Sequence, residues 1–82
     1  MESLIILYPN PASGFINYKI LDENVFDYSI KVFTINGQLI YYQTQNTKNK
    51  GIINLNGCKP GLYLIKFESD EKQFIKKIII QN

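Results

Sequence analysis

Few residues in this sequence belong to the types that catalyse reactions or hold metal ions. Its 82 residues include no histidine, so the commonest general base and metal ligand is missing. The hydroxyl groups of Ser13, Ser29 and Ser69 therefore have no imidazole to activate them. Cys58 is the single cysteine, which excludes an internal disulfide and a cysteine-based metal cluster. We expect Cys58 to be an inert, buried or half-buried side chain, and the protein to be no enzyme and to have no cofactor.

Two groups of carboxylates remain as candidate cation ligands. Asp22, Glu23 and Asp27 fall in one predicted loop, and Asp70 and Glu71 fall in another. Neither group has the alternating spacing with which a dedicated Ca²⁺ loop places its ligands. We interpret both groups as solvated charge in turns and expect no metal site.

The basic residues do not indicate a nucleic-acid partner. Nine lysines, no arginine and seven acidic residues give a net charge of +2. The sequence lacks the cluster of basic residues that is typical of nucleic-acid binders. Lys76 and Lys77 are of interest for their position, because they interrupt an apolar segment over residues 74–80. In a strand the two side chains point to opposite faces. They either protect an edge strand from aggregation or belong to a strand that a partner protein pairs with.

Exposed aromatic residues would give another kind of site, a platform that stacks on sugar rings. The candidates are Tyr41 and Tyr42, with Tyr18 and Phe33. Adjacent residues of a strand point to opposite faces, so at most one of Tyr41 and Tyr42 joins a flat platform. A carbohydrate-binding or fibronectin-like accessory domain of a secreted enzyme is therefore kept as the alternative interpretation.

The elements that position these residues are predicted to be strands. Apolar and polar side chains alternate with a period of two, as at Tyr63, Ile65 and Phe67, and no stretch has helical spacing over three turns. The predicted strands cover residues 3–8, 15–21, 28–35, 38–45, 50–55, 61–69 and 72–80. Short strands joined by turns predict one all-β domain over residues 1–82, a seven-stranded antiparallel β-sandwich of immunoglobulin-like type. A Greek-key crossover is expected, and the pattern leaves the strand order open.

Turn residues separate these strands. The segment 9–14 combines two prolines with a glycine and predicts a stiff corner that places the first strand. Asn36-Gly37 predicts a type I′ hairpin turn, which needs positive φ at both residues. The residues expected to form this structural motif are Pro9, Asn10, Pro11, Gly14 and Gly37.

Four segments follow one another along the chain, Tyr8–Gly14 and residues 30–40, 54–66 and 74–80. In this order they resemble the type A C-terminal sorting domains of the type IX secretion system, the Por secretion system. Tyr8–Gly14 resembles the opening signature of that family, and residues 30–40 resemble its strand, glycine turn and strand. Residues 54–66 are similar to its Leu-x-x-Gly-x-Tyr region, and residues 74–80 to its terminal basic pair followed by aliphatic residues. The family usually has leucine where Cys58 stands, a departure that a small apolar thiol tolerates.

The resemblance implies a role in targeting. Such domains lie at the C-terminus of cargo secreted by Gram-negative bacteria, and the outer-membrane export machinery recognises them. A sortase-like protease often removes them, and the cargo is released or attached to the cell surface. We therefore expect residues 1–82 to be excised from a larger secreted or cell-surface protein that passes through the periplasm and outer membrane.

The expected partners are the export machinery, the sortase-like protease and the upstream cargo domain. On this interpretation the last predicted hairpin is the surface that the machinery reads. The expected partner-binding residues are Gly61, Tyr63, Lys76, Lys77, Ile78, Ile79 and Ile80. Exposed strand edges also predict self-association of the isolated domain through its strands.

Overall fold

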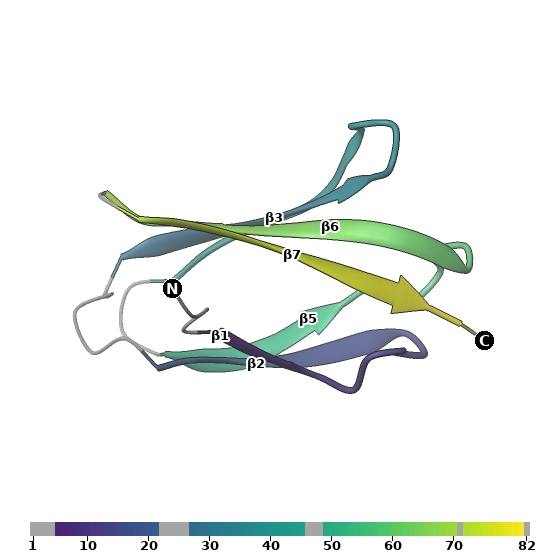
Figure 1. The fold of residues 1–82 in the computed structure, drawn as a ribbon, viewed down its shortest axis with the longest axis horizontal. Coiled ribbons are helices and arrows are strands. Elements are labelled where there is room, and N and C mark those ends of the chain that lie inside the picture. Colours follow the sequence, from purple (N-terminus) through teal and green to yellow (C-terminus); the bar gives the residue numbers. More distant parts are fainter. Residues whose placement is uncertain (1–4, 22–26, 46–48, 71, 82) are drawn as a thin grey trace.

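The chain folds into two β-sheets that pack face to face (Figure 1). The computed structural model describes residues 5–21, 27–45, 49–70 and 72–81. Its strands are β1 (Ile5–Tyr8), β2 (Phe15–Ile20), β3 (Tyr28–Thr34), β4 (Leu39–Gln45), β5 (Lys50–Asn54), β6 (Gly61–Glu68) and β7 (Gln73–Ile80). All seven predicted strands are confirmed, and within the described ranges their ends differ from the prediction by no more than one residue. The described residues form no helix, and hence none long and apolar enough to cross a membrane.

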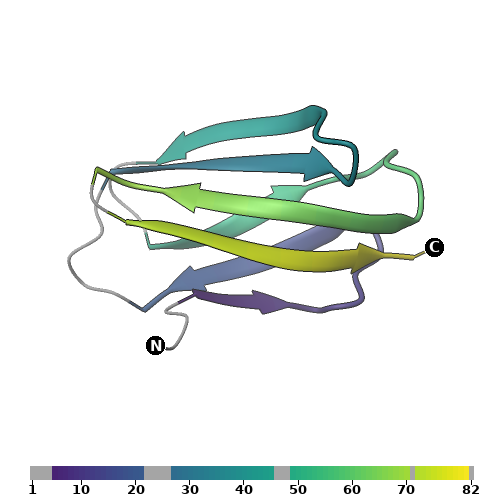
Figure 2. The same cartoon turned by 45° about the horizontal axis from the view of Figure 1, so that its top comes forward.

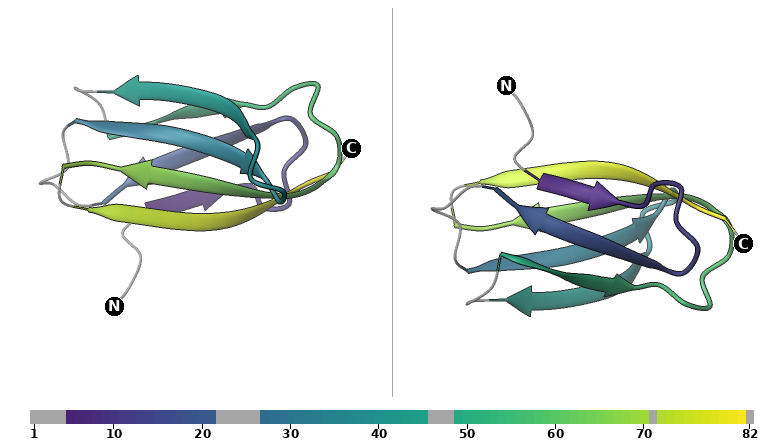
Figure 3. Two further views of the ribbon diagram at one scale, coloured as in Figure 1. Left: turned by 90° about the horizontal axis from the view of Figure 1, so that it is seen from above. Right: turned by 90° about the horizontal axis from the view of Figure 1, so that it is seen from below.

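The strand order makes the sandwich immunoglobulin-like. One sheet has the order β1-β2-β5 and the other the order β4-β3-β6-β7, with all pairs of neighbouring strands antiparallel (Figures 2 and 3). The pairs β2–β5 and β3–β6 join strands that are distant in the sequence, as Greek-key connections do. Strands β4 and β7 are therefore the opposite edges of the four-stranded sheet, and β1 and β5 are the edges of the other sheet.

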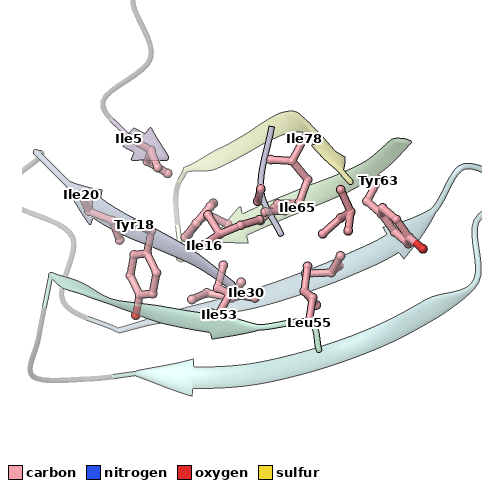
Figure 4. Packing of buried hydrophobic residues seen from close by; sticks show 14 of the residues in the cluster. Ile5, Ile16, Tyr18, Ile20, Ile30, Ile53, Leu55, Tyr63, Ile65 and Ile78 are labelled. Carbon is pink, nitrogen blue, oxygen red and sulfur yellow. The ribbon is translucent and has the colours of Figure 1, made fainter. Parts of the chain in front are cut away.

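The core lies between the two sheets and consists of alternate residues of the strands (Figure 4). The three alternating series that the sequence predicts on β2, β3 and β6 are all buried, at most 8% exposed. They comprise Ile16, Tyr18, Ile20, Tyr28, Ile30, Val32, Tyr63, Ile65 and Phe67. Strands β5 and β7 close the core with Ile53, Ile78 and Ile80. Full burial of one such aliphatic or aromatic side chain stabilises the fold by roughly 1.5–3 kcal/mol, so the period-two pattern is what holds the two sheets together.

Two buried tyrosines share a hydrogen bond in this core. The Oη atoms of Tyr18 and Tyr28 are 3.0 Å apart, and the rings meet edge to face with centroids separated by 6.2 Å. Burial, and then the hydrogen bond to Tyr18, raises the pKa of Tyr28 well above the ordinary value for tyrosine. Gly51 lies opposite Tyr18 on β5, and a Cβ atom there would be 2.9 Å from the Tyr18 Oη. The glycine inside β5 therefore leaves room for the ring.

The turn between β3 and β4 differs from the prediction. Gly37 has a φ of +91°, but no described residue other than glycine has a positive φ, so the type I′ turn predicted at Asn36-Gly37 is wrong. The Gly37 N–H donates to the Thr34 C=O at 2.9 Å, and the Thr34 N–H donates to the Gln38 C=O at 2.9 Å. This pattern fits a three-residue loop, in which a type I turn is followed by a left-handed glycine. The hairpin forms as expected because one positive φ, at glycine, is sufficient for that loop.

The corner before β6 is fixed by Tyr63. The Tyr63 Oη donates to the Lys59 C=O at 2.5 Å, and the side chain belongs to the core. A tyrosine whose hydroxyl bonds to the backbone a few residues upstream, near the start of this strand, is a recurring feature of immunoglobulin-like sandwiches. The inward position that the alternation of Tyr63, Ile65 and Phe67 predicts is confirmed.

Candidate functional site: the terminal strand and its edge

β7 places its two lysines on different faces. Ile78 is fully buried, and Lys76 lies on the same side of the strand, where it is half-buried. Lys77 is exposed on the outer face between Ile75 and Ile79, which are 57% and 47% exposed. Each apolar series of the strand is therefore interrupted by one lysine, as the alternation requires.

Residues 9–14, between β1 and β2, form a bend that we call the N-terminal corner. It leaves the three-stranded sheet and reaches the edge of the other sheet, where Ala12 makes a parallel bridge to Ile80. Gly14, with a φ of +116°, accepts a hydrogen bond on its C=O from the Leu55 N–H at 2.7 Å. A Cβ atom at Gly14 would collide with the Asn56 side chain. The corner is thus held against both sheets. Its residues Pro9, Asn10 and Pro11 are exposed, and the bonds Tyr8–Pro9 and Asn10–Pro11 are cis.

The N-terminal corner covers the last part of the outer edge of β7. The Ala12 N–H donates to the Ile79 C=O at 2.8 Å, and the Gln81 N–H donates to the Ala12 C=O at 2.7 Å. The Asn10 side chain continues this contact along the strand. Its Oδ1 accepts from the Ile79 N–H at 3.0 Å, and its Nδ2 donates to the Lys77 C=O at 3.4 Å. One asparagine side chain therefore takes the place that a neighbouring strand would occupy.

The other half of the same edge has no such cover. Backbone groups alternate along an antiparallel strand, so those of Gln73 and Ile75 point away from β6, as those of Ile79 do. Within the described part of the chain, no partner is present for these groups or for the Lys77 N–H. We call Gln73–Lys77 the free edge of β7. It is long enough to pair with a short extended segment of another chain.

The outer face beside this edge carries apolar and basic side chains. Leu62 and Ile79 are cross-strand neighbours, 36% and 47% exposed. Lys31 and Lys66 lie further along the sheet, and the Nζ atom of each is 3.9 Å from Oε1 of Glu68. Such exposed pairs contribute at most about 1 kcal/mol each. Because two lysines share one carboxylate, this face has a positive balance next to its apolar residues.

The structure brings the predicted partner-binding residues together on the β6–β7 hairpin. Gly61 pairs with Ile80, and Tyr63 pairs with Ile78. Gly37, in contrast, lies in the β3–β4 turn, and β4 is at the opposite edge of the sheet from β7. The predicted partner-binding residues differ in their exposure. Those whose side chains lie in the core stabilise the hairpin and cannot touch a partner directly. Gly61, Lys77 and Ile79 are exposed, Lys76 is half-buried, and Tyr63, Ile78 and Ile80 are buried.

Sequence reasoning missed the contact between the N-terminal corner and β7. Asn10 and Lys77 are separated by 67 positions in the sequence, and no local pattern connects them. The one signal was an asparagine between two prolines, which equally fits an ordinary turn. Sequence reasoning predicts an edge strand at Lys76 and Lys77, but it gives no indication that the uncovered backbone is that of Gln73 and Ile75, because alternation does not show which half of a strand is covered.

The aromatic residues do not form the sugar platform of the alternative interpretation. Tyr18 is 1% exposed and part of the core. Tyr41 is half-buried and donates its hydroxyl hydrogen to Gln43, and burial raises the pKa of Tyr41, with a further contribution from the charge of Tyr18. Phe33 is half-buried, so Tyr42 is the one exposed ring among the four candidates.

The remaining chemical candidates give no site in the described ranges. Cys58 is half-buried and packs against the core, as expected. Of the carboxylate groups, Asp22, Glu23 and Glu71 lie outside the described residues. Among the residues that the structure does describe, no three His, Cys, Asp or Glu side chains come together as a metal site.

A two-layer all-β domain whose clearest surface feature is a partly covered strand edge has the character of a protein-interaction module. The model of the secretion system C-terminal sorting domain family matches residues 6–81. The chain therefore belongs to this family, the C-terminal sorting domains of the type IX secretion system. A comparison with curated proteins found no match.

Membership of this family establishes the general role. The domain is a sorting signal of type IX secretion, so it belongs to a secreted or cell-surface protein and interacts with the secretion machinery. Domains of this kind are typically non-catalytic.

Proposed function

We propose that residues 1–82 form the single C-terminal sorting domain of a larger secreted protein. In this proposal the domain directs its cargo through the type IX system, across the periplasm and outer membrane of a Gram-negative bacterium. The cargo is then released or attached to the cell surface after a sortase-like protease removes the domain. The family match over residues 6–81 supports this route.

In this proposal the export machinery recognises the domain through the free edge of β7. An extended segment of the machinery adds as a strand next to Gln73–Lys77, and its backbone bonds to the unpaired groups there. The N-terminal corner limits this pairing, because it already holds the backbone of Ile79. The observation that supports this mechanism is the change from covered to uncovered backbone along one strand.

Side chains on the outer face supply selectivity in the same proposal. Gln73, Ile75 and Lys77 point to this face in alternation, so a strand added at the free edge would meet a polar, aliphatic, basic series. A matching segment places an apolar residue opposite Ile75 and a carboxylate opposite Lys77. Lys76 points to the core side and protects the edge from unspecific pairing.

Export of a reporter protein fused to the domain tests the backbone part. The Ile75→Pro variant loses an N–H that points away from β6, so the sheet keeps its own hydrogen bonds while the free edge loses a donor. We expect this variant to fold, as shown by its thermal unfolding, and its cargo to stay inside the cell. The Ile75→Ala control keeps the N–H and loses only the side-chain contact, so its cargo should be exported better than that of Ile75→Pro. Normal export with Ile75→Pro would refute recognition through this edge.

The side-chain part is tested by reversing one charge. We expect a reporter fused to the Lys77→Glu variant to stay inside the cell. Lys19→Glu, on the outer face of the other sheet, should leave export of the reporter unchanged. Equal export by the two variants would contradict a role for Lys77. Deletion of residues 76–82 is a weaker experiment, because it also removes Ile78 and Ile80 from the core.

A further inference from the structure

β4 differs from the other three edge strands in carrying neither a charge nor a proline, and its one irregularity is a register shift against β3 at Ile40, near its start. β1 has four residues and is followed by Pro9, and β5 has five and begins with Lys50. β7 carries Lys76 and Lys77 and is half covered by the N-terminal corner. β4 has seven residues, Leu39–Gln45, without a charge or a proline. Natural sheets usually place a charge or a proline on such an edge, so the regular part of β4, residues 41–45, is a candidate surface for pairing.

The register shows which backbone groups of β4 are available. Thr34 directs its N–H toward the β4 side, where it bonds to the turn, so alternate residues of β3 do the same. The partners of Val32, Ile30 and Tyr28 on β4 are Tyr41, Gln43 and Gln45, all on one side of the register shift between Val32 and Phe33. The N–H and C=O groups of Tyr42 and Thr44 therefore point away from β3. In the part of the chain that the structure describes, these groups have no hydrogen-bond partner.

We propose that β4 pairs with β4 of a second copy of this chain, antiparallel about a two-fold axis beside Gln43. In this register Tyr42 lies opposite Thr44 of the second copy, and each of these residues donates and accepts one hydrogen bond across the axis. The two four-stranded sheets then become one continuous sheet. Figure 3 shows that β4 lies at the border of its sheet, so the second copy can approach from the side.

The choice of a second copy rests on self-complementarity. The register places Gln43 opposite its own copy and Tyr41 opposite Gln45, so it brings no like charges together. The Tyr42–Thr44 pair brings an aromatic ring beside a β-branched side chain, a combination that is favourable in such a ladder. A β7–β7 pair would instead bring the lysines Lys76 and Lys77 of both copies together.

The symmetry also limits the assembly. Each copy uses its single β4 edge, so the contact closes at a dimer and does not propagate. The free edges of β7 remain at the two ends of the joined sheet, because β4 and β7 are opposite edges. Dimerisation is therefore independent of the proposed recognition by the export machinery.

Sedimentation equilibrium over a wide range of concentrations, combined with amide hydrogen exchange, tests the dimer in the unmodified chain. We expect a monomer–dimer equilibrium in which the amides of Tyr42 and Thr44 exchange fast when dilute and slowly when concentrated. The amides of Gln73 and Ile75 should stay fast throughout. A monomer at every concentration, larger assemblies, or protection that appears at β7 instead of β4 would each overturn the proposal.

Charge exchange at the symmetry axis tests the register. In the Gln43→Lys and Gln43→Glu variants, like charges face each other, so each variant alone should dimerise at least about tenfold more weakly than the unmodified chain. An equimolar mixture brings Lys opposite Glu and should restore the dimer. Thr44→Pro, which removes an outward N–H, should also weaken the dimer, and Thr44→Ala, which keeps the N–H and loses only the side-chain pair, should weaken it less. If the mixture fails to restore the dimer although both variants are folded, the proposed axis at Gln43 is wrong.

Discussion

Replacement of Asn10 by alanine removes both side-chain hydrogen bonds between the N-terminal corner and β7. The Ile79 N–H loses its acceptor, which lies 3.0 Å away, and the Lys77 C=O loses a donor at 3.4 Å. The backbone bonds of Ala12 to Ile79 and of Gln81 to Ala12 remain. We therefore expect a folded protein in which the covered part of the β7 edge is shorter.

The size of the effect follows from the two distances. A hydrogen bond of ordinary length contributes a net 0.5–1.5 kcal/mol or so, and a contact at the outer limit of length contributes less. Both groups are at the surface, so water replaces the lost partners. We expect the free energy of unfolding to fall by about 1–1.5 kcal/mol in Asn10→Ala, a decrease of roughly 4–12 °C in the midpoint of thermal unfolding for a domain of this size.

Thermal and denaturant unfolding measure this loss, and amide exchange locates it. Asn10→Asp is the matched control, because it keeps an oxygen for the Ile79 N–H and loses the donor to Lys77. It should lose less than about half as much stability as Asn10→Ala. Exchange of the Ile79 amide should become faster in the alanine variant. If the alanine variant is as stable as the unmodified protein, or the aspartate variant is equally destabilised, the side chain does not hold the edge as argued.

Three further predictions concern the core. Ile78→Ala should cost about 2–5 kcal/mol because the side chain is fully buried, and the neighbouring Ile79→Ala should stay within about 1 kcal/mol; denaturant unfolding distinguishes them. Tyr63→Phe should lose about 1–2 kcal/mol in the same assay, since the hydroxyl hydrogen bond before β6 is lost. The raised pKa of Tyr28 means that the folded protein holds a proton which the unfolded chain releases near pH 10. Stability should therefore fall as the pH rises above about 10, by up to about 1.4 kcal/mol per unit from this group, and Tyr28→Phe should lack that part of the decline.

The strands and their inward faces could be predicted because their causes are local. The alternation at Tyr63, Ile65 and Phe67 shows directly which side chains avoid water, and these three residues are in the core. The turn at Asn36-Gly37 was located correctly, but its type was not. Several hairpin loops place a glycine with positive φ at that position, so the dipeptide alone does not select between them.

The order of the strands and the cover of β7 could not be predicted, because both depend on distant contacts. Alternation is the same in a central strand as in an edge strand, so the sequence of β7 does not show that β6 is its single neighbouring strand. Asn10 does not belong to an alternating apolar series, so no pattern in the sequence indicates that its side chain bonds to Ile79 and Lys77. Its geometry follows from the crossing of the N-terminal corner between the sheets, which is a property of the whole fold.

The sequence allows two interpretations of Lys76 and Lys77, either as protection of an edge strand or as part of a strand that a partner pairs with. The two interpretations are compatible, because the N-terminal corner covers one half of β7 and leaves the other half free. Lys76 points to the core side, where a charge at a sheet edge discourages unspecific pairing. Lys77 points outward, at the boundary where the Asn10 side chain ends its contact and the uncovered backbone begins. An edge that is entirely covered would offer a partner no backbone groups, and an edge that is entirely free would pair with any exposed strand. In the recognition that we propose, a strand that is half covered and carries one inward and one outward lysine would accept a short segment at one position.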